Sequence, residues 1–167
     1  MEDEMTSTRV PVARLTRETF GGLGTVVPSE PGREPDVVRE GLRFWDRAGA
    51  MSIPGEVEMG ILELSAQPFV FDSMERHVDT PEMFVPLKGV SVMPIGLGSG
   101  PDGFPSPDEI RGFLIDPGVS IIINPGVWHW IPYPLSSVAT YLIPALVGTP
   151  IEDREVRLLD EPLRFSL

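Results

Sequence analysis

The chain has 167 residues, of which 41% are apolar, and it contains no cysteine. That length is enough for one well-buried core and too short for two ordinary domains, and the missing thiols exclude disulfides, thiolate zinc sites and cysteine nucleophiles. The formal net charge of -12 repels phosphate backbones and anionic lipids, so we expect neither a nucleic-acid nor a membrane partner.

The composition also bears on the fold class. The 17 glycines and 19 prolines interrupt long helical runs and favour short strands joined by turns. The start, MEDEMTSTR, is acidic and polar where a secretory signal would be basic and then apolar, and no apolar run approaches the ~18 residues of a membrane span. We therefore expect an all-β, cytoplasmic protein, with a disordered acidic tail at residues 1–9 and a single domain at residues 10–167.

The first elements after the tail are short. Thr16 is placed to cap a short helical turn that Gly21 and Gly22 would end. A strand at 25–27 follows, and residues 28–36 have the composition of a loop. Apolar segments then recur between turn signals at 41–45, 56–64, 84–97, 113–115, 120–124, 127–131 and 139–147. Strands at this spacing, without helices between them, predict a sandwich or barrel.

The remaining segments are turn-rich or charged. Residues 98–109, GSGPDGFPSPDE, form a predicted surface loop in which Ser106 could open one helical turn. This loop lacks the glycine fingerprints of phosphate-binding loops, so we expect no nucleotide or flavin cofactor. The segment after Pro150 is charged, and its leucines and Phe165 are available to hold it against the barrel.

Four side chains form a candidate site. On a strand, Glu75 and His77 point to the same side while Arg76 points away. Glu82 would enter the next strand facing the same interior if that strand pairs antiparallel with the first. The second histidine, His129, follows a turn at NPG that would let it cross the barrel wall inward. Two histidines and two carboxylates are a reasonable shell for Mn, Fe, Ni or Zn, with positions left open for a substrate.

Three further residues are candidates for binding substrate or donating a proton. Lys88 lies an even number of positions after Glu82, so on a regular strand it would point to the same side and could reach the mouth of the cavity, where its ammonium would hold an anionic substrate. The alternative is that Lys88 is an exposed lysine in a turn. Tyr133 is a candidate donor and Arg111 a candidate cation. For Glu75 and His77 the alternative is that they are polar residues at a solvated strand end, without a functional role. The alternation also places Trp128 and Trp130 on the face away from His129, where aromatic residues usually serve as packing.

The spacing of the histidines resembles that of a known superfamily. His77, Glu82 and Gly89 are similar to the first cupin motif, H-x(3-4)-E-x(6)-G, with Glu75 where another histidine often stands. The segment from Gly118 through NPGVWH resembles the second cupin motif, which ends in a metal-binding histidine, and His129 matches it. The resemblance implies a cupin-like β-barrel, also called a double-stranded β-helix or jelly roll.

A closer resemblance covers residues 10–134. VPVARLTRETFG, LSAQPFVFDSMERH, FVPLKG and IRGFLIDPG, followed by GVWH, are similar to the ureidoglycolate lyase family. That resemblance implies a commonly dimeric enzyme of purine (allantoin) breakdown that splits ureidoglycolate into glyoxylate and urea. Glu75, His77, Glu82 and His129 would surround the reacting centre, one carboxylate would act as base, and Lys88 or Tyr133 would donate a proton.

Two positions depart from the family pattern and keep other functions open. Trp130 stands where the pattern has a second histidine, and Glu82 stands where it has glutamine. One alternative is another metal-dependent cupin enzyme, a lyase, isomerase or dioxygenase, acting on a small hydroxy or keto acid. A second alternative is a non-catalytic cupin that binds a small molecule.

Overall fold

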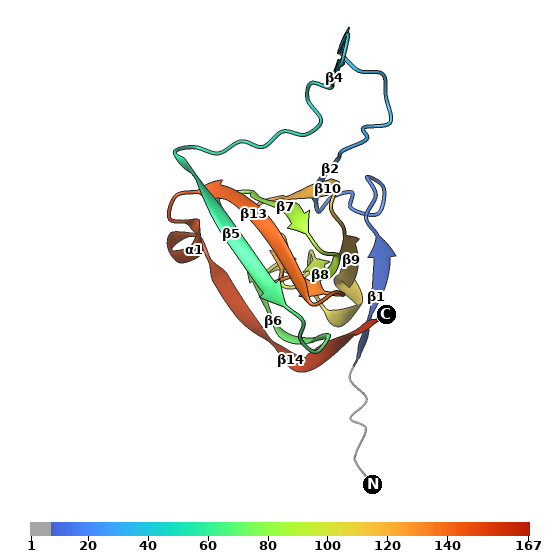
Figure 1. The fold of residues 1–167 in the computed structure, drawn as a ribbon. Coiled ribbons are helices and arrows are strands. Elements are labelled where there is room, and N and C mark those ends of the chain that lie inside the picture. The colour runs from blue at the N-terminus through green and yellow to red at the C-terminus, as the bar shows by residue number, and fades with distance from the viewer. Residues whose placement is uncertain (1–7) are drawn as a thin grey trace.

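The computed structural model describes residues 8–167 and consists almost entirely of strands (Figure 1). Residues 1–7, most of the predicted acidic tail, lie outside the described residues. The strands are β1 (Arg9–Arg14), β2 (Gly24–Pro28), β3 (Val37–Arg39), β4 (Leu42–Phe44), β5 (Val57–Ser65), β6 (Val70–Arg76), β7 (Glu82–Lys88), β8 (Ser91–Gly96), β9 (Ile110–Ile115), β10 (Val119–Ile123), β11 (Trp128–His129), β12 (Tyr133–Pro134), β13 (Val138–Leu146) and β14 (Glu155–Ser166). The described residues also contain the 3-10 helix η1 (Pro107–Glu109) and one short α-helix, α1 (Thr149–Glu152). The predicted all-β class is confirmed.

Six of the strands close into a ring. Their order is β11-β6-β14-β1-β9-β8, and β11 pairs with both β6 and β8, so no strand of the ring has a free edge. The strands of this ring, together with β12, contribute one buried apolar cluster, which we call the ring core. Its members are Val10, Phe71, Met74, Val92, Ile110, Trp128, Tyr133, Leu163 and Phe165.

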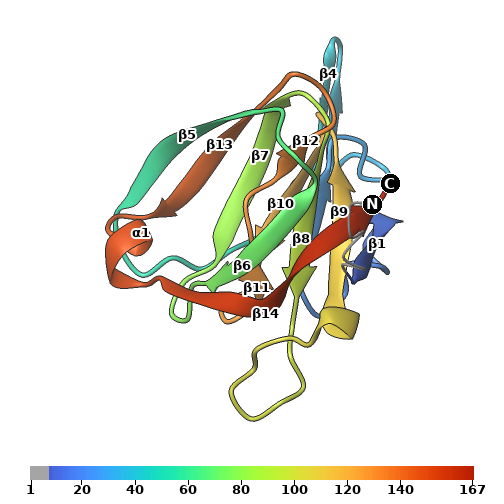
Figure 2. The same cartoon turned by 90° about the horizontal axis from the view of Figure 1, so that it is seen from below.

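A second layer covers one side of the ring. The five-stranded sheet β2-β10-β7-β13-β5 lies across from β8 and β9, as the view in Figure 2 shows. Between the two layers is a second buried cluster, the intersheet core, which includes Phe84, Met93, Ile121 and Tyr141. Because side chains alternate along a strand, β8 serves both cores: Val92 enters the ring core and Met93 the intersheet core. The ring and the sheet therefore share a wall.

Most predicted strands are present, with shifted ends. The predicted stretch at 84–97 divides into β7 and β8 at Gly89, whose φ is +76°. A side chain there would be strained, and its Cβ would lie 2.3 Å from the carbonyl oxygen of Val138. The predicted N-terminal turn is also found: the Phe20 amide donates to the Thr16 carbonyl at 3.0 Å, and Thr16 Oγ1 accepts from the Thr19 amide at 3.0 Å.

Both ends of the described chain form strands that the sequence analysis did not predict. β1 begins at Arg9, the last residue of the predicted tail, and the charged segment after Pro150 becomes the twelve-residue strand β14 between β1 and β6. In β14 Leu163 and Phe165 enter the ring core while Leu158 faces outward. The hairpin β3–β4 extends away from the barrel (Figure 1). Among residues 8–167, no helix has the length and apolar character needed to cross a membrane.

Candidate active site

The two histidines and two glutamates predicted from the sequence converge between the ring and the five-stranded sheet. Glu75 lies near the end of β6, His77 follows that strand, and His129 on the neighbouring β11 is paired directly with Glu75. Glu82 is the first residue of β7. The pairing of β6 with β7, on which the expected position of Glu82 was conditional, is not present, because β7 pairs with β10 and β13. Glu82 reaches the histidines from the opposite sheet.

The predicted alternation around these residues is confirmed. The guanidinium of Arg76 lies 4.7 Å from the ring centroid of Trp128, which belongs to the ring core. Glu75 and His77 consequently face the other side of β6, toward the five-stranded sheet. Strands β6 and β11 thus present packing residues on one face and polar residues on the other.

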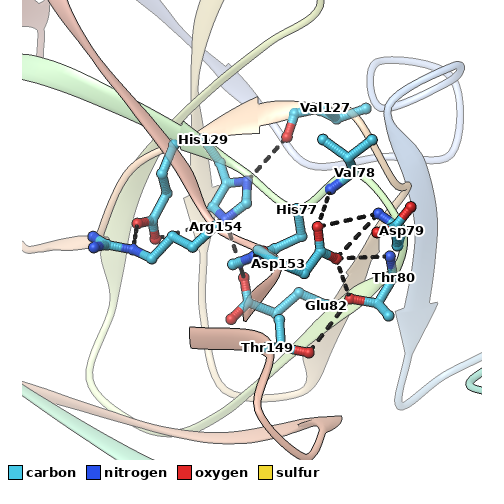
Figure 3. Close-up of polar contacts among 11 residues, drawn as sticks. His77, Val78, Asp79, Thr80, Glu82, Val127, His129, Thr149, Asp153 and Arg154 are labelled. Carbon is cyan, nitrogen blue, oxygen red and sulfur yellow. Dashed lines mark hydrogen bonds and ion pairs between the residues drawn. The ribbon is translucent and has the colours of Figure 1, made fainter. Parts of the chain in front are cut away.

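A single carboxylate oxygen lies between the two imidazoles. Glu82 Oε2 is 3.2 Å from His77 Nε2 and 3.0 Å from His129 Nε2 (Figure 3). Glu75 Oε1 is 4.0 Å from His129 Nε2. The histidine side chains are 5% and 2% exposed and the carboxylates about 15%, so the cluster is shielded but reachable from solvent through its acidic members.

Backbone carbonyls assign the tautomers of both imidazoles. His77 Nδ1 contacts the carbonyl oxygen of Asp153, and His129 Nδ1 lies 3.1 Å from that of Val127. A carbonyl only accepts, so each Nδ1 carries its proton and each Nε2 is directed at the oxygen of Glu82. A neutral imidazole would then place a lone pair against a carboxylate, and so the arrangement requires a positive charge at its centre, either a proton or a metal ion.

The charges of this cluster shift two pKa values. Burial raises the pKa of Glu82, but the contacts with His129 and His77 outweigh burial and lower it to about 2. Burial lowers the pKa of His77, but the hydrogen bond and the charge of Glu82 outweigh burial and raise it. Glu82 therefore remains ionised at neutral pH, and it favours the protonated form of His77.

Three of the four predicted metal ligands form a group that can hold an ion. One atom each from Glu75, His77 and His129 can be chosen so that all lie within 4.8 Å of one another. The donor set, two imidazoles with backbone-fixed tautomers and a carboxylate, suits a divalent transition metal. Glu82 is not part of this group, although its oxygen contacts both imidazoles.

Sequence comparison identifies the family to which this site belongs. The sequence model described as ureidoglycolate lyase matches residues 7–166. The chain belongs to the ureidoglycolate lyase family. It is 31% identical over 137 residues to a ureidoglycolate lyase of Burkholderia cepacia, covering 79% of this chain and 76% of that protein. It is 29% identical over 146 residues to a ureidoglycolate lyase of Rhodobacter capsulatus, covering 84% and 88%.

An epimerase is among the solved structures that resemble the chain. It is the dTDP-6-deoxy-D-glucose-3,5-epimerase RmlC of Legionella pneumophila, with 14% identity, a TM-score of 0.44, and coverage of 68% of this chain and 66% of that one.

The three other predicted site residues of this family member lie away from the cluster. Lys88 ends β7, at the opposite end of that strand from Glu82. Arg111 donates to the carbonyls of Asp108 at 2.8 Å and Ile110 at 3.1 Å. Tyr133 is buried in the ring core, where burial raises the pKa of its hydroxyl to about 12. The structure does not bring these three side chains to the histidines.

Two residues that the sequence analysis missed hold the cluster in place. The Asp153 carboxylate accepts hydrogen bonds from the amides of Val78 at 2.7 Å and Thr80 at 3.0 Å, and from the Asp79 amide (Figure 3). It thereby fixes the turn between His77 and Glu82. Arg154 Nε donates to Glu75 Oε2 at 2.5 Å. Both residues follow α1 and lie more than 70 positions from their partners, so no local motif could have revealed them.

A small cavity adjoins the cluster at Glu82. It has a volume of about 160 Å³ and its lining includes Ile61, Leu62, Ile143 and Pro150. Pockets for drug-sized ligands are typically about 300–1,000 Å³, so this one suits a small substrate. A larger cavity of about 450 Å³, lined by Phe104, Leu159 and neighbouring residues, includes none of the four cluster residues.

Proposed function

We propose that this chain is a ureidoglycolate lyase that releases urea from ureidoglycolate and leaves glyoxylate. Membership of the family supports the proposal, and one structural observation carries it: two imidazoles with fixed tautomers converge on one ionised carboxylate beside a small cavity. Such a cluster supplies the proton acceptor and the proton donor that this elimination needs.

The reaction is the breakdown of a carbinolamine. A base removes the proton of the hydroxyl group on the carbon that also carries the carboxylate and the urea nitrogen. The oxygen electrons form the carbonyl of glyoxylate, the carbon–nitrogen bond breaks with its electrons passing to nitrogen, and an acid protonates that nitrogen to give urea. Each positioned proton transfer typically contributes ~10²- to 10⁴-fold to the rate.

The two carboxylates suit different tasks. A carboxylate whose pKa is about 2 is a weak base, so Glu82 serves to hold positive charge on His77. Glu75 has one oxygen paired with Arg154, while its other oxygen faces the cluster without a hydrogen bond to any described residue. We assign Glu75 as the base that takes the hydroxyl proton, and His77, whose pKa is raised, as the donor to the departing nitrogen.

A divalent metal ion fits the same residues. Glu75, His77 and His129 would hold it, because their ligand atoms converge and the backbone fixes both imidazoles with Nε2 toward the centre. When bound, the ion would lower the pKa of the substrate hydroxyl and hold its negative charge. Because Glu75 and His77 Nε2 would then be ligands, the proton-transfer roles assigned to them above belong to the metal-free form of the site. Mn, Fe, Ni or Zn are candidates by donor type.

Two measurements test the proposal. Purified protein incubated with ureidoglycolate should release urea and glyoxylate in equal amounts, and protein reloaded with each candidate metal should be assayed in parallel. No urea under any of these conditions would reject the lyase assignment. Elemental analysis of protein purified without chelators should find about one ion per chain, and the ion should be absent from His129→Gln. A metal-free protein with full activity would reject metal assistance.

The alternatives make different predictions in the same experiments. Another cupin enzyme would bind the metal and turn over a different small hydroxy or keto acid. The substitution that kept this alternative open, Trp130, packs against the ring core on the face away from His129, which removes the reason to expect that it changes the substrate. A non-catalytic binding protein would show no turnover in the wild type, so His77→Gln and His129→Gln would have no effect on turnover.

We also propose a cytoplasmic homodimer acting on a small anionic substrate. The edge strand β5 supports the dimer: Met59 and Ile61 are 64% and 66% exposed on one face, next to the unpaired edge of the five-stranded sheet. Exposed edges of this kind commonly pair with another chain. Met59→Lys should convert a dimer to a monomer in light scattering. Leu158→Lys, at an exposed apolar position on β14, should not. A monomeric wild type would reject the dimer.

A further inference from the structure

The acidic character of the site poses an electrostatic problem. Glu75 and Glu82 lie within the cluster, and the chain carries a formal net charge of -12. An anionic substrate would be repelled by both carboxylates and by the long-range field. A proton on His77 or a bound ion offsets part of this negative charge, and a fixed positive group beside the cluster would favour binding of a carboxylate further.

Arg154 is the cation that the fold brings to this position. Among the lysines and arginines of residues 8–167, it alone forms an ion pair with a member of the cluster, through its Nε and Glu75 Oε2. The other candidate cations lie away from the cluster or are bound to other groups. Lys88 lies at the far end of β7, Arg111 binds backbone carbonyls, and Arg76 pairs with Glu155 on the other face of β6.

The free end of Arg154 is suited to a carboxylate. A guanidinium carries five N–H donors, and in the described residues only the Nε–H of Arg154 has a hydrogen-bond partner. Its side chain is 41% exposed, and its two terminal nitrogens form no hydrogen bond with any described residue. Two parallel N–H donors match the two oxygens of a carboxylate, a geometry that lysine cannot offer.

We propose that Arg154 is the specificity residue of the site, binding the carboxylate of the substrate through its terminal nitrogens. The inference rests on the proposed lyase function and deepens it. In a 2-hydroxy acid the hydroxyl stands on the carbon next to the carboxylate. Since Glu75 pairs with the same guanidinium, a carboxylate held by Arg154 places that hydroxyl beside the proposed base. The site should therefore select small 2-hydroxy acids over their neutral analogues.

Equilibrium binding of two matched probes tests this role without any turnover. Glycolate and glycolamide have the same number of heavy atoms and differ in the charged group, and NMR titration can follow both. Wild-type protein should prefer glycolate. Arg154→Ala should weaken glycolate binding by about 10- to 100-fold, the value of a charge-assisted hydrogen bond, and leave glycolamide binding within about twofold. Arg154→Lys should retain part of the preference, because it keeps the charge and loses the fork.

The controls separate this role from a structural one. Arg164→Ala removes the same charge from an exposed position on β14 and should change neither affinity. If Arg154 only held Glu75 in place, its removal would weaken both probes equally, and that result would overturn the proposal. Equal wild-type affinities for the two probes would do the same.

Steady-state kinetics distinguish failure of this inference from failure of the proposed function. Urea release by the wild type with an unchanged KM in Arg154→Ala would reject the role of Arg154 alone. A glycolate preference that disappears in Arg154→Ala, in a protein that releases no urea, would reject the lyase assignment and support the carboxylate site.

Discussion

The two faces of the wall formed by β6 and β11 differ in what they contribute. On the face that lines the ring core, Trp128 and Met74 are fully buried among apolar residues. On the other face, one residue along each strand, Glu75 and His129 belong to the polar cluster. A rigid packed face thus fixes the backbone from which the reactive side chains project, which is how a site gains precision from a scaffold. Substitutions on either face should separate stability from activity.

The largest effect on activity is expected at His129. His129→Gln removes both an imidazole that contacts Glu82 at 3.0 Å and a ligand of the proposed ion. Since this loss disturbs the groups that perform both proton transfers, we expect turnover to fall by ~10²- to 10⁴-fold. The adjacent substitution Trp128→Phe should lower the free energy of unfolding by about 1–3 kcal/mol and leave turnover per folded molecule nearly unchanged. Urea release and thermal unfolding, measured on both variants, check the contrast.

Loss of activity in both variants in proportion to lost folded protein would contradict that separation. It would mean that the two faces of the wall act as one structural unit, and that the cluster has no chemical role of its own.

The two carboxylates offer a sharper version of the comparison. Glu75→Gln removes the proposed base but leaves Glu82 between the imidazoles, and we expect kcat to fall by about 10²-fold while both histidines keep their contacts. The kcat of the variant under saturating ureidoglycolate is the measurement. If kcat is unchanged, the base is a different group.

The sequence was sufficient to predict the strands whose apolar residues lie between turn signals. It also predicted the cluster, because Glu75 and His77 lie two residues apart on one strand and because His129 follows a glycine turn. Gly126 has a φ of +83°, and its amide donates to the carbonyl of His77 at 2.6 Å. That turn joins the two halves of the site, so the spacing carried real structural information.

The parts that could not be predicted depend on contacts between distant segments. β14 carries charges on its outer positions and only two buried residues near its end. Its sequence alone therefore resembles a charged terminal segment, and its strand structure depends on pairing with β1 and β6. Arg154 and Asp153 belong to no sequence motif. They contact the cluster only because the chain returns to it after α1. Lys88 and Glu82 are an even number of positions apart and so face the same side of β7, but this spacing does not bring their side chains close together along the strand.

Asp153 tests how strongly the returning chain holds the site. Asp153→Asn cannot accept all the hydrogen bonds from the turn at 78–80, and we expect the free energy of unfolding to fall by about 1–3 kcal/mol, with reduced turnover because the turn between His77 and Glu82 is held less firmly. Glu152→Gln, an exposed neighbour, is the matched control. An unchanged stability would show that the turn needs no cap.

The same substitution has a pH dependence whose sign follows from the pKa of Asp153. Burial raises that pKa, but hydrogen bonds from Val78, Thr80 and Asp79 outweigh burial and lower it below the usual value of 3.8. The carboxylate therefore stabilises the folded state at all pH values above 3.8, and this contribution is lost as pH falls through the lowered pKa. The stability difference between wild type and Asp153→Asn should shrink in that acidic range.

The smallest effect is expected at Lys88. It lies six positions from Glu82 on β7, and at about 3.3 Å per residue the two Cα atoms lie roughly 20 Å apart, farther than a lysine side chain can span. Lys88→Ala should change KM and kcat by no more than about twofold, the usual effect of a surface substitution, while Arg154→Ala raises KM. A tenfold rise in KM for Lys88→Ala would mean that a second copy of the chain brings its lysine to the cluster, since strand geometry within one chain prevents the contact.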